Sequence, residues 1–471
     1  MRRALFILSF LFIYGSAFAE IRLGAIFTDG MVLQRQSAVP IWGWASPGTN
    51  VTIESSWNHQ KYNVKANEKG KWLVKVQTPD AGGPYSLALN DGTPYTIKDI
   101  LIGEVWLCSG QSNMEMPLKG FRGQPIIGSN DAILHSANNH LRLYTVPRSS
   151  QLQPQDDSKP SVWKEANPEN VANFSATAYY FGRLLQEILQ VPVGLIHSSY
   201  GGSTIEAWMD RELLQDFKEV SLPKDSIPVK NRTPTTLFNG MIHPIVGYTI
   251  KGCIWYQGES NYENPDLYEQ LFPAMVKRWR ALWNQGNFPF YYAQIAPYNY
   301  AQLPPYHTGG KYNSAFLRDA QRKSLEKIPN SEMISLMDVG EENCIHPANK
   351  KVGGERFALI ALSNVYGKKG FAWASPSYES MEVQGGQAIV HFKHATLGLS
   401  AFGGELHNFE IAGEDKVFYP AQGLIKGNTV ILSSPSVVKP LAVRYAFKDF
   451  ARGELFSTAG LPVASFRTDN W

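Results

Sequence analysis

Between residues 99 and 370, short apolar segments alternate with longer segments of helical spacing, and this alternation is the strongest constraint on the fold. Six segments have the apolar composition of buried strands: 104–108, 141–146, 193–197, 252–256, 290–295 and 333–338. Four segments place apolar residues at helical spacing: 174–189, 267–283, 315–328 and 349–366. Strands that alternate with helices are typical of a parallel sheet with crossover helices. The sequence therefore predicts an α/β domain over residues 99–370.

Shorter strand-like runs, separated by Gly, Pro, Asn and Asp, occupy the chain on both sides of this region. Over residues 20–98 their number and spacing predict an N-terminal β-sandwich-like domain. The same pattern returns over 371–471. It fits either an independent C-terminal β-sandwich-like domain or strands that complete the N-terminal one, and we expect a separate domain.

The first 19 residues have the features of a secretory signal peptide. Met1-Arg2-Arg3 is followed by an apolar stretch over 4–14 and then by small residues that end at Ala19. The apolar stretch is shorter than the ~20 residues that span a bilayer, and no later segment of the sequence is long and apolar enough to do so. We therefore expect cleavage near Ala19 and an exported protein, periplasmic or secreted, without a membrane span.

The charge balance argues against nucleic acid as a partner. The chain has 44 Lys and Arg residues against 41 Asp and Glu residues, so no strong positive charge would attract phosphate. Its three cysteines are an odd number, which disfavours a disulfide framework, and we expect Cys108 and Cys253 to be small buried side chains. Histidine and cysteine do not occur at zinc-site spacing, so we expect no zinc site, and the chemistry inferred below needs neither a metal nor an organic cofactor. The sequence does not predict an oligomeric state.

Chemically active residue types follow four of the predicted strands. Ser112 lies in a Gly-Gln-Ser-Asn-Met turn after the first strand, and Gly201-Gly202 follow the third. Gln257 follows the fourth strand, and His346 lies beyond the sixth, just before a helical segment. The carboxyl ends of parallel strands meet at one edge of a sheet, where ligands bind. We therefore expect these residues to converge at that edge.

A serine and a histidine at one site predict acyl transfer. The serine hydroxyl is a weak nucleophile until a base takes its proton, and His346, with an ordinary pKa near ~6.5, can do so at neutral pH. The glycines after the third strand let backbone N–H groups approach a developing oxyanion, and the Gln257 amide is a further candidate donor. Each feature alone also fits a purely structural role. The G-x-S-x-G elbow of α/β-hydrolases is absent, because Met114 stands where its second glycine would be. The prediction of a serine hydrolase therefore depends on the set of four.

The order of these motifs resembles the SGNH hydrolase superfamily and, more closely, the sialate O-acetylesterase family. The matching segments are Gly-Gln-Ser-Asn-Met, Gly-Gly-Ser-Thr-Ile-Glu-Ala-Trp, Trp-Tyr-Gln-Gly-Glu-Ser-Asn and Ile-His-Pro, together with 27–35, 40–44 and 466–471. The resemblance implies a three-layer α/β/α SGNH domain with a parallel sheet. It implies Ser112 as the nucleophile and His346 as the base. The implied oxyanion donors are the backbone N–H groups of Ser112 and Gly202, with Gly201 as the near alternative, and the Gln257 amide.

One position departs from the superfamily pattern. An aspartate three residues before the histidine usually orients the imidazole, and Asn343 stands there in this chain. Asparagine can hold a neutral imidazole but stabilises an imidazolium less than a carboxylate does. Asp338, Glu341 or Glu342 could take this role instead, as could a backbone carbonyl, and a Ser–His dyad is a further possibility. A thiol nucleophile at Cys344 is disfavoured, because neighbouring positions in a turn rarely point at each other.

The resemblance implies hydrolysis of an O-acetyl ester on a sugar through an acetyl-serine intermediate, with O-acetylated sialic acid as the substrate. Two alternatives stay open. One is an esterase that acts on acetylated xylan or another acetylated sugar. The other is a carbohydrate-binding protein built on an inactive hydrolase scaffold, although the presence of both Ser112 and His346 argues against it.

Overall fold

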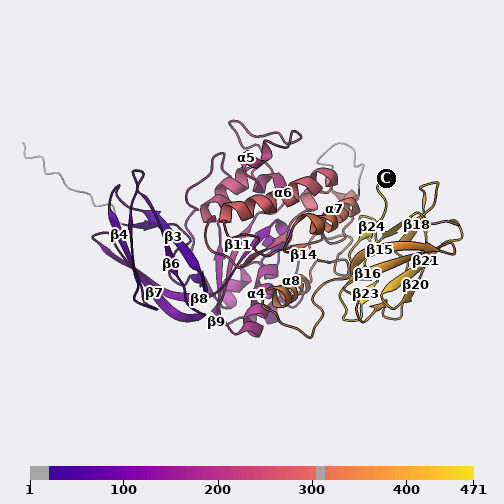
Figure 1. Ribbon diagram of the computed structural model, residues 1–471, viewed down its shortest axis with the longest axis horizontal. Coiled ribbons are helices and arrows are strands. Elements are labelled where there is room, and N and C mark those ends of the chain that lie inside the picture. The colour runs from indigo at the N-terminus through magenta and orange to yellow at the C-terminus, as the bar shows by residue number, and fades with distance from the viewer. Residues whose placement is uncertain (1–20, 304–312) are drawn as a thin grey trace, which may run out of the picture.

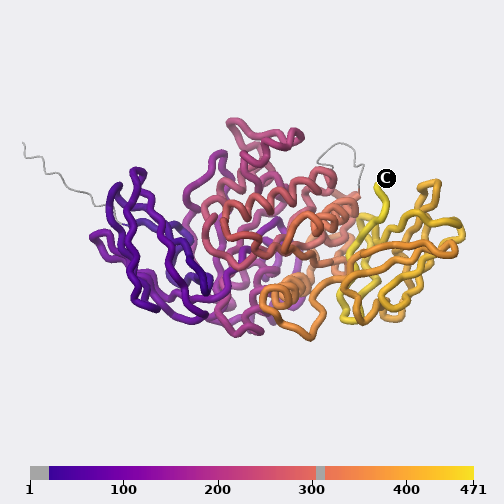
Figure 2. Tube along the Cα trace, viewed as in Figure 1, coloured from indigo at the N-terminus to yellow at the C-terminus, as the bar shows by residue number. Residues whose placement is uncertain are grey.

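The computed structural model describes residues 21–303 and 313–471. The molecule is elongated, with a β region at each end and an α/β region between them (Figure 1). The tube view shows the same order, from the indigo N-terminal strands to the yellow C-terminal strands (Figure 2). Within the described ranges, no strand of one β region pairs with a strand of the other. The C-terminal strands therefore do not complete the N-terminal sheets.

The central sheet has the strand order β10-β9-β11-β8-β12-β13-β14. Its strands are β8 (Pro94–Gly110), β9 (Asn138–Thr145), β10 (Lys164–Ala166), β11 (Val193–Ser199), β12 (Gly252–Tyr256), β13 (Phe290–Ala293) and β14 (Ser331–Ile334). All run parallel except the short edge strand β10, which pairs antiparallel with β9. Each predicted strand segment overlaps one of the parallel strands, so the predicted α/β fold is confirmed.

Helices cover both faces of this sheet (Figure 1). On one face α4 (Ala176–Leu189) packs against α8 (Lys350–Asn364), and on the other α6 (Pro265–Trp283) packs against α7 (Ser314–Lys327). The shorter helices are α1 (Ser112–Glu115), α2 (Ser129–Leu134), α3 (Pro168–Ala172), α5 (Arg211–Leu214), η1 (Ile205–Trp208), η2 (Phe238–Ile242), η3 (His243–Ile245), η4 (Glu259–Asn261) and η5 (Tyr300–Gln302). Of the described helices, none has the length and apolar character to cross a bilayer.

The central strands of the sheet are buried between two cores, one on each face. Every residue of β11 and β12 is buried, as expected for strands covered on both faces. On the α4 face, Trp106 and Phe181 meet edge to face at 5.1 Å between ring centroids. On the α6 face, Trp255 and Trp279 do the same at 5.6 Å. Buried aromatic pairs of this geometry stabilise the three layers.

Strand β8 joins the N-terminal region to the central sheet. Its first half pairs antiparallel with β7, and its second half runs parallel between β11 and β12. The N-terminal strands are β1 (Arg22–Leu23), β2 (Val32–Gln34), β3 (Ala38–Trp44), β4 (Asn50–Ser55), β5 (Lys61–Lys65), β6 (Lys71–Gln77) and β7 (Gly82–Asn90). The expected division at residue 98 falls inside β8, so the two regions share one continuous strand.

The C-terminal region has its own sheets and its own core around Phe409, Tyr445 and Phe466. Its strands are β15 (Ser377–Gln384), β16 (Gln387–Lys393), β17 (Leu399–Ser400), β18 (Phe409–Ala412), β19 (Phe418–Pro420), β20 (Gln422–Lys426), β21 (Thr429–Ser433), β22 (Ala442–Tyr445), β23 (Phe456–Ser457) and β24 (Phe466–Arg467). Buried hydrogen bonds join this core to the central region. The Gln294 amide both donates to and accepts from the backbone of Ser465, at 3.0 and 3.1 Å.

Candidate active site

The turn that carries Ser112 depends on a glycine at the end of β8. Gly110 has a φ of +142°, and a Cβ on it would lie 2.1 Å from the carbonyl oxygen of Tyr256 on the neighbouring strand β12. Only a residue without a side chain lets the two strand ends approach this closely. Helix α1 then begins at Ser112, which is partly exposed, whereas Asn113 and Met114 are buried. The turn thus places Ser112 at the surface of the carboxyl edge.

Hydrogen bonds from both neighbours of Ser112 hold the other predicted segments against it. The Gln111 side-chain oxygen accepts from the N–H groups of Gly258 (3.2 Å) and Ser260 (3.3 Å), in the loop after β12. The Asn113 amide donates to the carbonyl oxygen of Ile345, the residue before His346, at 3.1 Å. Sheet topology therefore brings the Ser112 turn, the loop after β12 and the His346 segment to one place. This is the edge where the carboxyl ends of parallel strands meet.

The His346 ring is held by a side chain that the sequence did not indicate. Its Nδ1 lies 2.6 Å from the Gln124 side-chain oxygen, and its ring packs edge to face against Phe121 at 5.4 Å. A carbonyl oxygen can only accept, so Nδ1 carries the proton and Nε2 keeps the lone pair that a general base needs. In this conformation no hydrogen bond joins the Ser112 hydroxyl to the ring within the described ranges. Such contacts often tighten only when substrate binds.

Within the described ranges, none of the residues expected to orient His346 has a hydrogen bond to its ring. Both carboxylate oxygens of Asp338 accept from Arg356, at 2.8 and 2.6 Å. The Asn343 side-chain oxygen accepts from Gln302 at 2.8 Å, and Glu342 is exposed. Gln124 occupies the contact instead, although it lies 222 residues earlier in the chain. No motif marks Gln124, because its role depends on a tertiary contact and on no local pattern.

Buried polar groups lie directly beneath the site. The Lys350 ammonium donates to the Asn113 side-chain oxygen at 2.5 Å, and the Asn113 amide donates to Glu259 at 2.5 Å. Burial lowers the pKa of Lys350 to about 7 and raises the pKa of Glu259. Burial also lowers the pKa of His346 to about 4, and the charge of Lys350 acts in the same direction. His346 is therefore neutral at neutral pH, the state that can accept a proton.

The glycines after β11 differ in what their backbones can offer an oxyanion. The Gly201 N–H already donates to Glu115 at 2.7 Å. Gly202 has a φ of +68°, and a Cβ on it would lie 2.8 Å from the Asn231 amide nitrogen, so glycine is needed here. Within the described chain, the N–H groups of Ser112 and Gly202 have no hydrogen-bond partner. These two donors are therefore available for a ligand.

The Gln257 amide is already engaged. It is fully buried and donates to the Ser203 carbonyl oxygen (3.1 Å) and to the Asn261 side-chain oxygen (2.7 Å). Both amide hydrogens are thereby used, so in this conformation Gln257 braces the loop after β12. A role as oxyanion donor would require it to give up one of these bonds.

A charged cluster borders the site on the side of α1. Arg148 Nε and Nη2 lie 2.6 and 2.5 Å from the Glu115 carboxylate, and the guanidinium stacks over the Tyr200 ring at 4.5 Å. The Arg148 side chain is 54% exposed. Since Glu115 lies one turn after Ser112 on α1, a half-exposed guanidinium paired with Glu115 stands near the rim of the site.

The cysteines lie in positions that do not suit catalysis. Cys108 and Cys253 are fully buried, as predicted, and burial raises the pKa of both thiols. The Cys344 thiol donates to the backbone carbonyl of His346 at 3.3 Å, away from the imidazole nitrogens. The described residues contain no group of three or more His, Cys, Asp or Glu side chains placed to hold a metal ion.

The three-layer fold, with a serine turn and an imidazole at the carboxyl edge of its sheet, defines an SGNH-type carboxylic ester hydrolase. A profile of the family described as carbohydrate esterase, sialic acid-specific acetylesterase, matches residues 102–361. The chain is similar to the sialate O-acetylesterases of Homo sapiens and Pongo abelii, each 30% identical, with 80% of this chain and 77% of the relative covered. The chain belongs to the sialate O-acetylesterase family.

A solved structure agrees with this assignment over nearly the whole chain. It is described as a novel carbohydrate acetylesterase from Xanthomonas citri, and it matches with a TM-score of 0.86 and 35% identity. The match covers 96% of this chain and 100% of that chain. The similarity therefore includes both β regions as well as the central sheet.

Proposed function

We propose that this protein removes O-acetyl groups from sugars, with Ser112 as the nucleophile and His346 as the general base. The observation that carries the proposal is the pair of hydrogen bonds around Ser112. Gln111 binds the loop after β12, and Asn113 binds the segment that carries His346. A neutral imidazole, a partly exposed serine and two free N–H donors together match what acyl transfer requires.

The reaction would proceed in two halves. His346 Nε2 takes the proton of the Ser112 hydroxyl as its Oγ bonds to the acetyl carbonyl carbon, and the N–H groups of Ser112 and Gly202 hold the resulting oxyanion. The bond from the acetyl carbon to the sugar oxygen then breaks, and the sugar oxygen receives the proton from His346. Water, activated by the same imidazole, attacks the acetyl-serine and releases acetate.

Gln124 acts in this scheme as the positioning residue for His346. Its neutral amide fixes the tautomer without offering a full negative charge to the imidazolium. The arrangement is a Ser–His dyad with an amide in place of the usual carboxylate. Asn343, Asp338 and Glu342 are not needed for it.

The substrate we propose is an O-acetylated sialic acid, the class named for the curated relatives. Sialic acid carries a carboxylate, and Arg148 offers a guanidinium at the rim of the site. Glu115 engages Nε and Nη2, which leaves Nη1 without a partner among the described residues. An acetylated xylan would present no carboxylate to the free Nη1, so a contact with this one group distinguishes the two substrates, although Glu115 balances the charge of the guanidinium.

The proposed chemistry is tested by replacing the two central side chains. Ser112→Ala and His346→Ala should each lower kcat on 4-nitrophenyl acetate and on O-acetylated mucin by at least ~10³-fold, the scale of serine-triad knockouts. Cys344→Ala is the control and should keep kcat within a few-fold. Near-background activity in the wild type, equal to that of Ser112→Ala, would instead favour a binding protein on an inactive scaffold.

The proposed substrate is tested by Arg148→Gln, which removes the charge. The KM for O-acetylated sialic acid should rise about tenfold or more, because a charge-assisted hydrogen bond is lost. The KM for 4-nitrophenyl acetate and for acetylated xylan should stay unchanged. A wild type that prefers acetylated xylan, with no effect of Arg148→Gln on either sugar, would point to the neutral sugar instead.

We propose further that residues 1–19 direct export, so that the enzyme meets glycans in the periplasm or outside the cell. These residues lie outside the described part of the chain. Mass determination of the protein purified from the periplasm and the medium would show whether the chain begins just after Ala19.

A further inference from the structure

One outward face of the N-terminal region carries two partly exposed indoles. In the antiparallel pair β3–β6, Trp42 lies opposite Leu73, and Trp44 lies opposite Lys71. Directly opposite residues share a face of a sheet, so all four side chains project to the same side. Both tryptophans are only partly buried, and Leu73 is 54% exposed. Solvent-facing positions of antiparallel strands are ordinarily polar, so large apolar groups at these positions suggest a contact surface.

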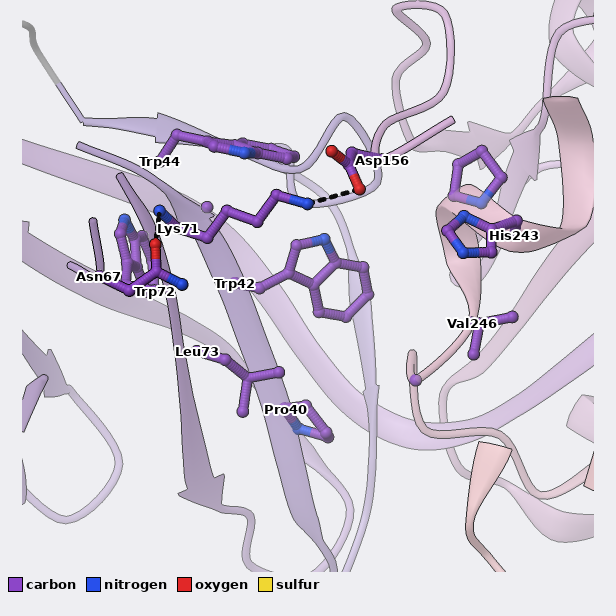
Figure 3. Close-up of a pocket in the computed structure, with 13 residues that line it drawn as sticks. Pro40, Trp42, Trp44, Asn67, Lys71, Trp72, Leu73, Asp156, His243 and Val246 are labelled. Atoms are coloured by element: carbon purple, nitrogen blue, oxygen red, sulfur yellow. Dashed lines mark hydrogen bonds and ion pairs between the residues drawn. The ribbon is translucent and has the colours of Figure 1, made fainter. Parts of the chain in front are cut away.

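This face forms one wall of a pocket (Figure 3). The pocket has a volume of about 380 Å³, within the ~300–1,000 Å³ range of small-molecule sites. The opposite wall belongs to the central region and includes Asp156, His243 and Val246. Lys71 and Asp156 reach across and pair at 2.5 Å. The pocket thus combines aromatic faces from one region with hydrogen-bonding groups from both.

The polar groups of the pocket are held in place yet remain accessible. The Lys71 and Asp156 side chains are 40% and 59% exposed, so each can bind a ligand while paired with the other. The His243 Nδ1 donates to the Gln155 carbonyl oxygen at 2.8 Å, which leaves Nε2 as an acceptor. The Arg22 guanidinium stacks on Trp44 at 3.6 Å and fixes the indole, although Arg22 does not line the pocket.

The chemistry of the pocket selects one class of ligand. An indole beside paired donors and acceptors suits a ring that has one apolar C–H face and several hydroxyl groups. Because Lys71 and Asp156 neutralise each other, the pocket offers no net charge to an anion such as sialic acid. We propose that this pocket binds a neutral pyranose unit of a glycan chain, separately from the Ser112 site. It contains none of the residues proposed for catalysis, so the inference stands apart from the proposed mechanism.

Calorimetric titration of the full chain tests this inference. The probes are N-acetyllactosamine, xylohexaose and cellohexaose as neutral glycans, and free sialic acid as the anionic comparison. At least one neutral glycan should bind, and sialic acid should not bind at this pocket. Trp42→Ala and Asp156→Ala should each weaken that binding by about tenfold or more, as expected for an aromatic anchor and a central polar contact.

Trp57→Ala is the matched control, because Trp57 lies in the same region, outside the pocket, and packs against Tyr85. It should bind the glycan like the wild type. The inference is overturned if no neutral glycan binds, if only sialic acid binds, or if the two pocket variants bind like Trp57→Ala. Hydrolysis of 4-nitrophenyl acetate by Trp42→Ala, Asp156→Ala and Trp57→Ala reports whether these three variants are folded. Loss of this activity in Ser112→Ala tests the proposed mechanism, whereas glycan binding by Trp42→Ala tests this inference. Either claim can therefore fail without the other.

Discussion

At the scale of single residues, the account depends on how His346 is held. The imidazole hydrogen-bonds to the neutral Gln124 amide, and both its burial and the charge of Lys350 lower its pKa, so its charged form is disfavoured. A serine hydrolase with a carboxylate in the Gln124 position would stabilise the imidazolium that forms during catalysis. The amide does not supply that stabilisation, and burial together with the charge of Lys350 keeps the base deprotonated in mildly acidic solution.

This arrangement predicts an unusual pH profile. His346 must be neutral to accept the Ser112 proton, and its pKa is about 4. We therefore expect kcat/KM to be retained down to about that pH and to fall at lower pH. Gln124→Glu places a carboxylate against Nδ1 and raises the pKa of His346. The acidic limb of the kcat/KM profile, where activity falls as the pH is lowered, should therefore move to higher pH by roughly one unit or more.

The matched control for this change is Asn343→Ala, at the position where the superfamily places an aspartate. It should leave the acidic limb in place and lower kcat by less than about tenfold. An acidic limb near the ordinary histidine pKa in the wild type, or a limb that Gln124→Glu does not move, would contradict the role given to Gln124.

At the scale of elements, the sequence located the strands well and their junctions poorly. The predicted segment 252–256 coincides with β12, because a short apolar run bounded by glycines has few other uses in a parallel sheet. The same pattern did not reveal that β8 runs unbroken from residue 94 to 110. Lys98 and Asp99 interrupt the apolar pattern, and Asp99 has a φ of +55° at a register shift between β7 and β8, yet the pairing resumes on both sides of them. Backbone pairing between two regions leaves no mark in side-chain periodicity.

At the junction of β8 and α1, we predict that one added methyl group on Gly110 lowers the free energy of unfolding strongly. Gly110→Ala would force a Cβ against the Tyr256 carbonyl at an unfavourable φ, and should lower the free energy of unfolding by roughly 3 kcal/mol. Gly286→Ala is the control, because Gly286 has a φ of +67° but no atom near its Cβ. It should cost roughly 1 kcal/mol. Urea denaturation measures the free energy of unfolding of both variants. Equal losses of stability would show that the close approach of Gly110 to Tyr256 does not determine the cost.

At the scale of the whole molecule, buried polar contacts join the central and C-terminal regions. Arg318 on α7 has no exposed surface and donates to the carbonyl oxygens of Ala446 and Lys448. Sequence reasoning predicted both regions from their composition but could not predict this contact or that of Gln124 with His346. Both join residues more than a hundred positions apart, and a single sequence records no such pairing.

The Arg318 contacts predict that the C-terminal region depends on them. Arg318→Met removes two charge-assisted hydrogen bonds, at roughly 1.5–3 kcal/mol each, and should lower the free energy of unfolding by about 3 kcal/mol. Limited proteolysis should then cut first in the C-terminal region. Lys439→Met, at an exposed position of the same region, should change stability by less than about 0.5 kcal/mol. If the two variants unfold alike, the buried contacts do not hold the regions together.

The acetyl-serine intermediate is the central claim, and rapid-quench mass spectrometry with 4-nitrophenyl acetate tests it most directly. The wild type should carry one acetyl group on the peptide that contains Ser112, and Ser112→Ala should carry none there and turn over at background rate. An acetyl group found instead on another residue such as Cys344, or normal turnover by Ser112→Ala, would contradict the account.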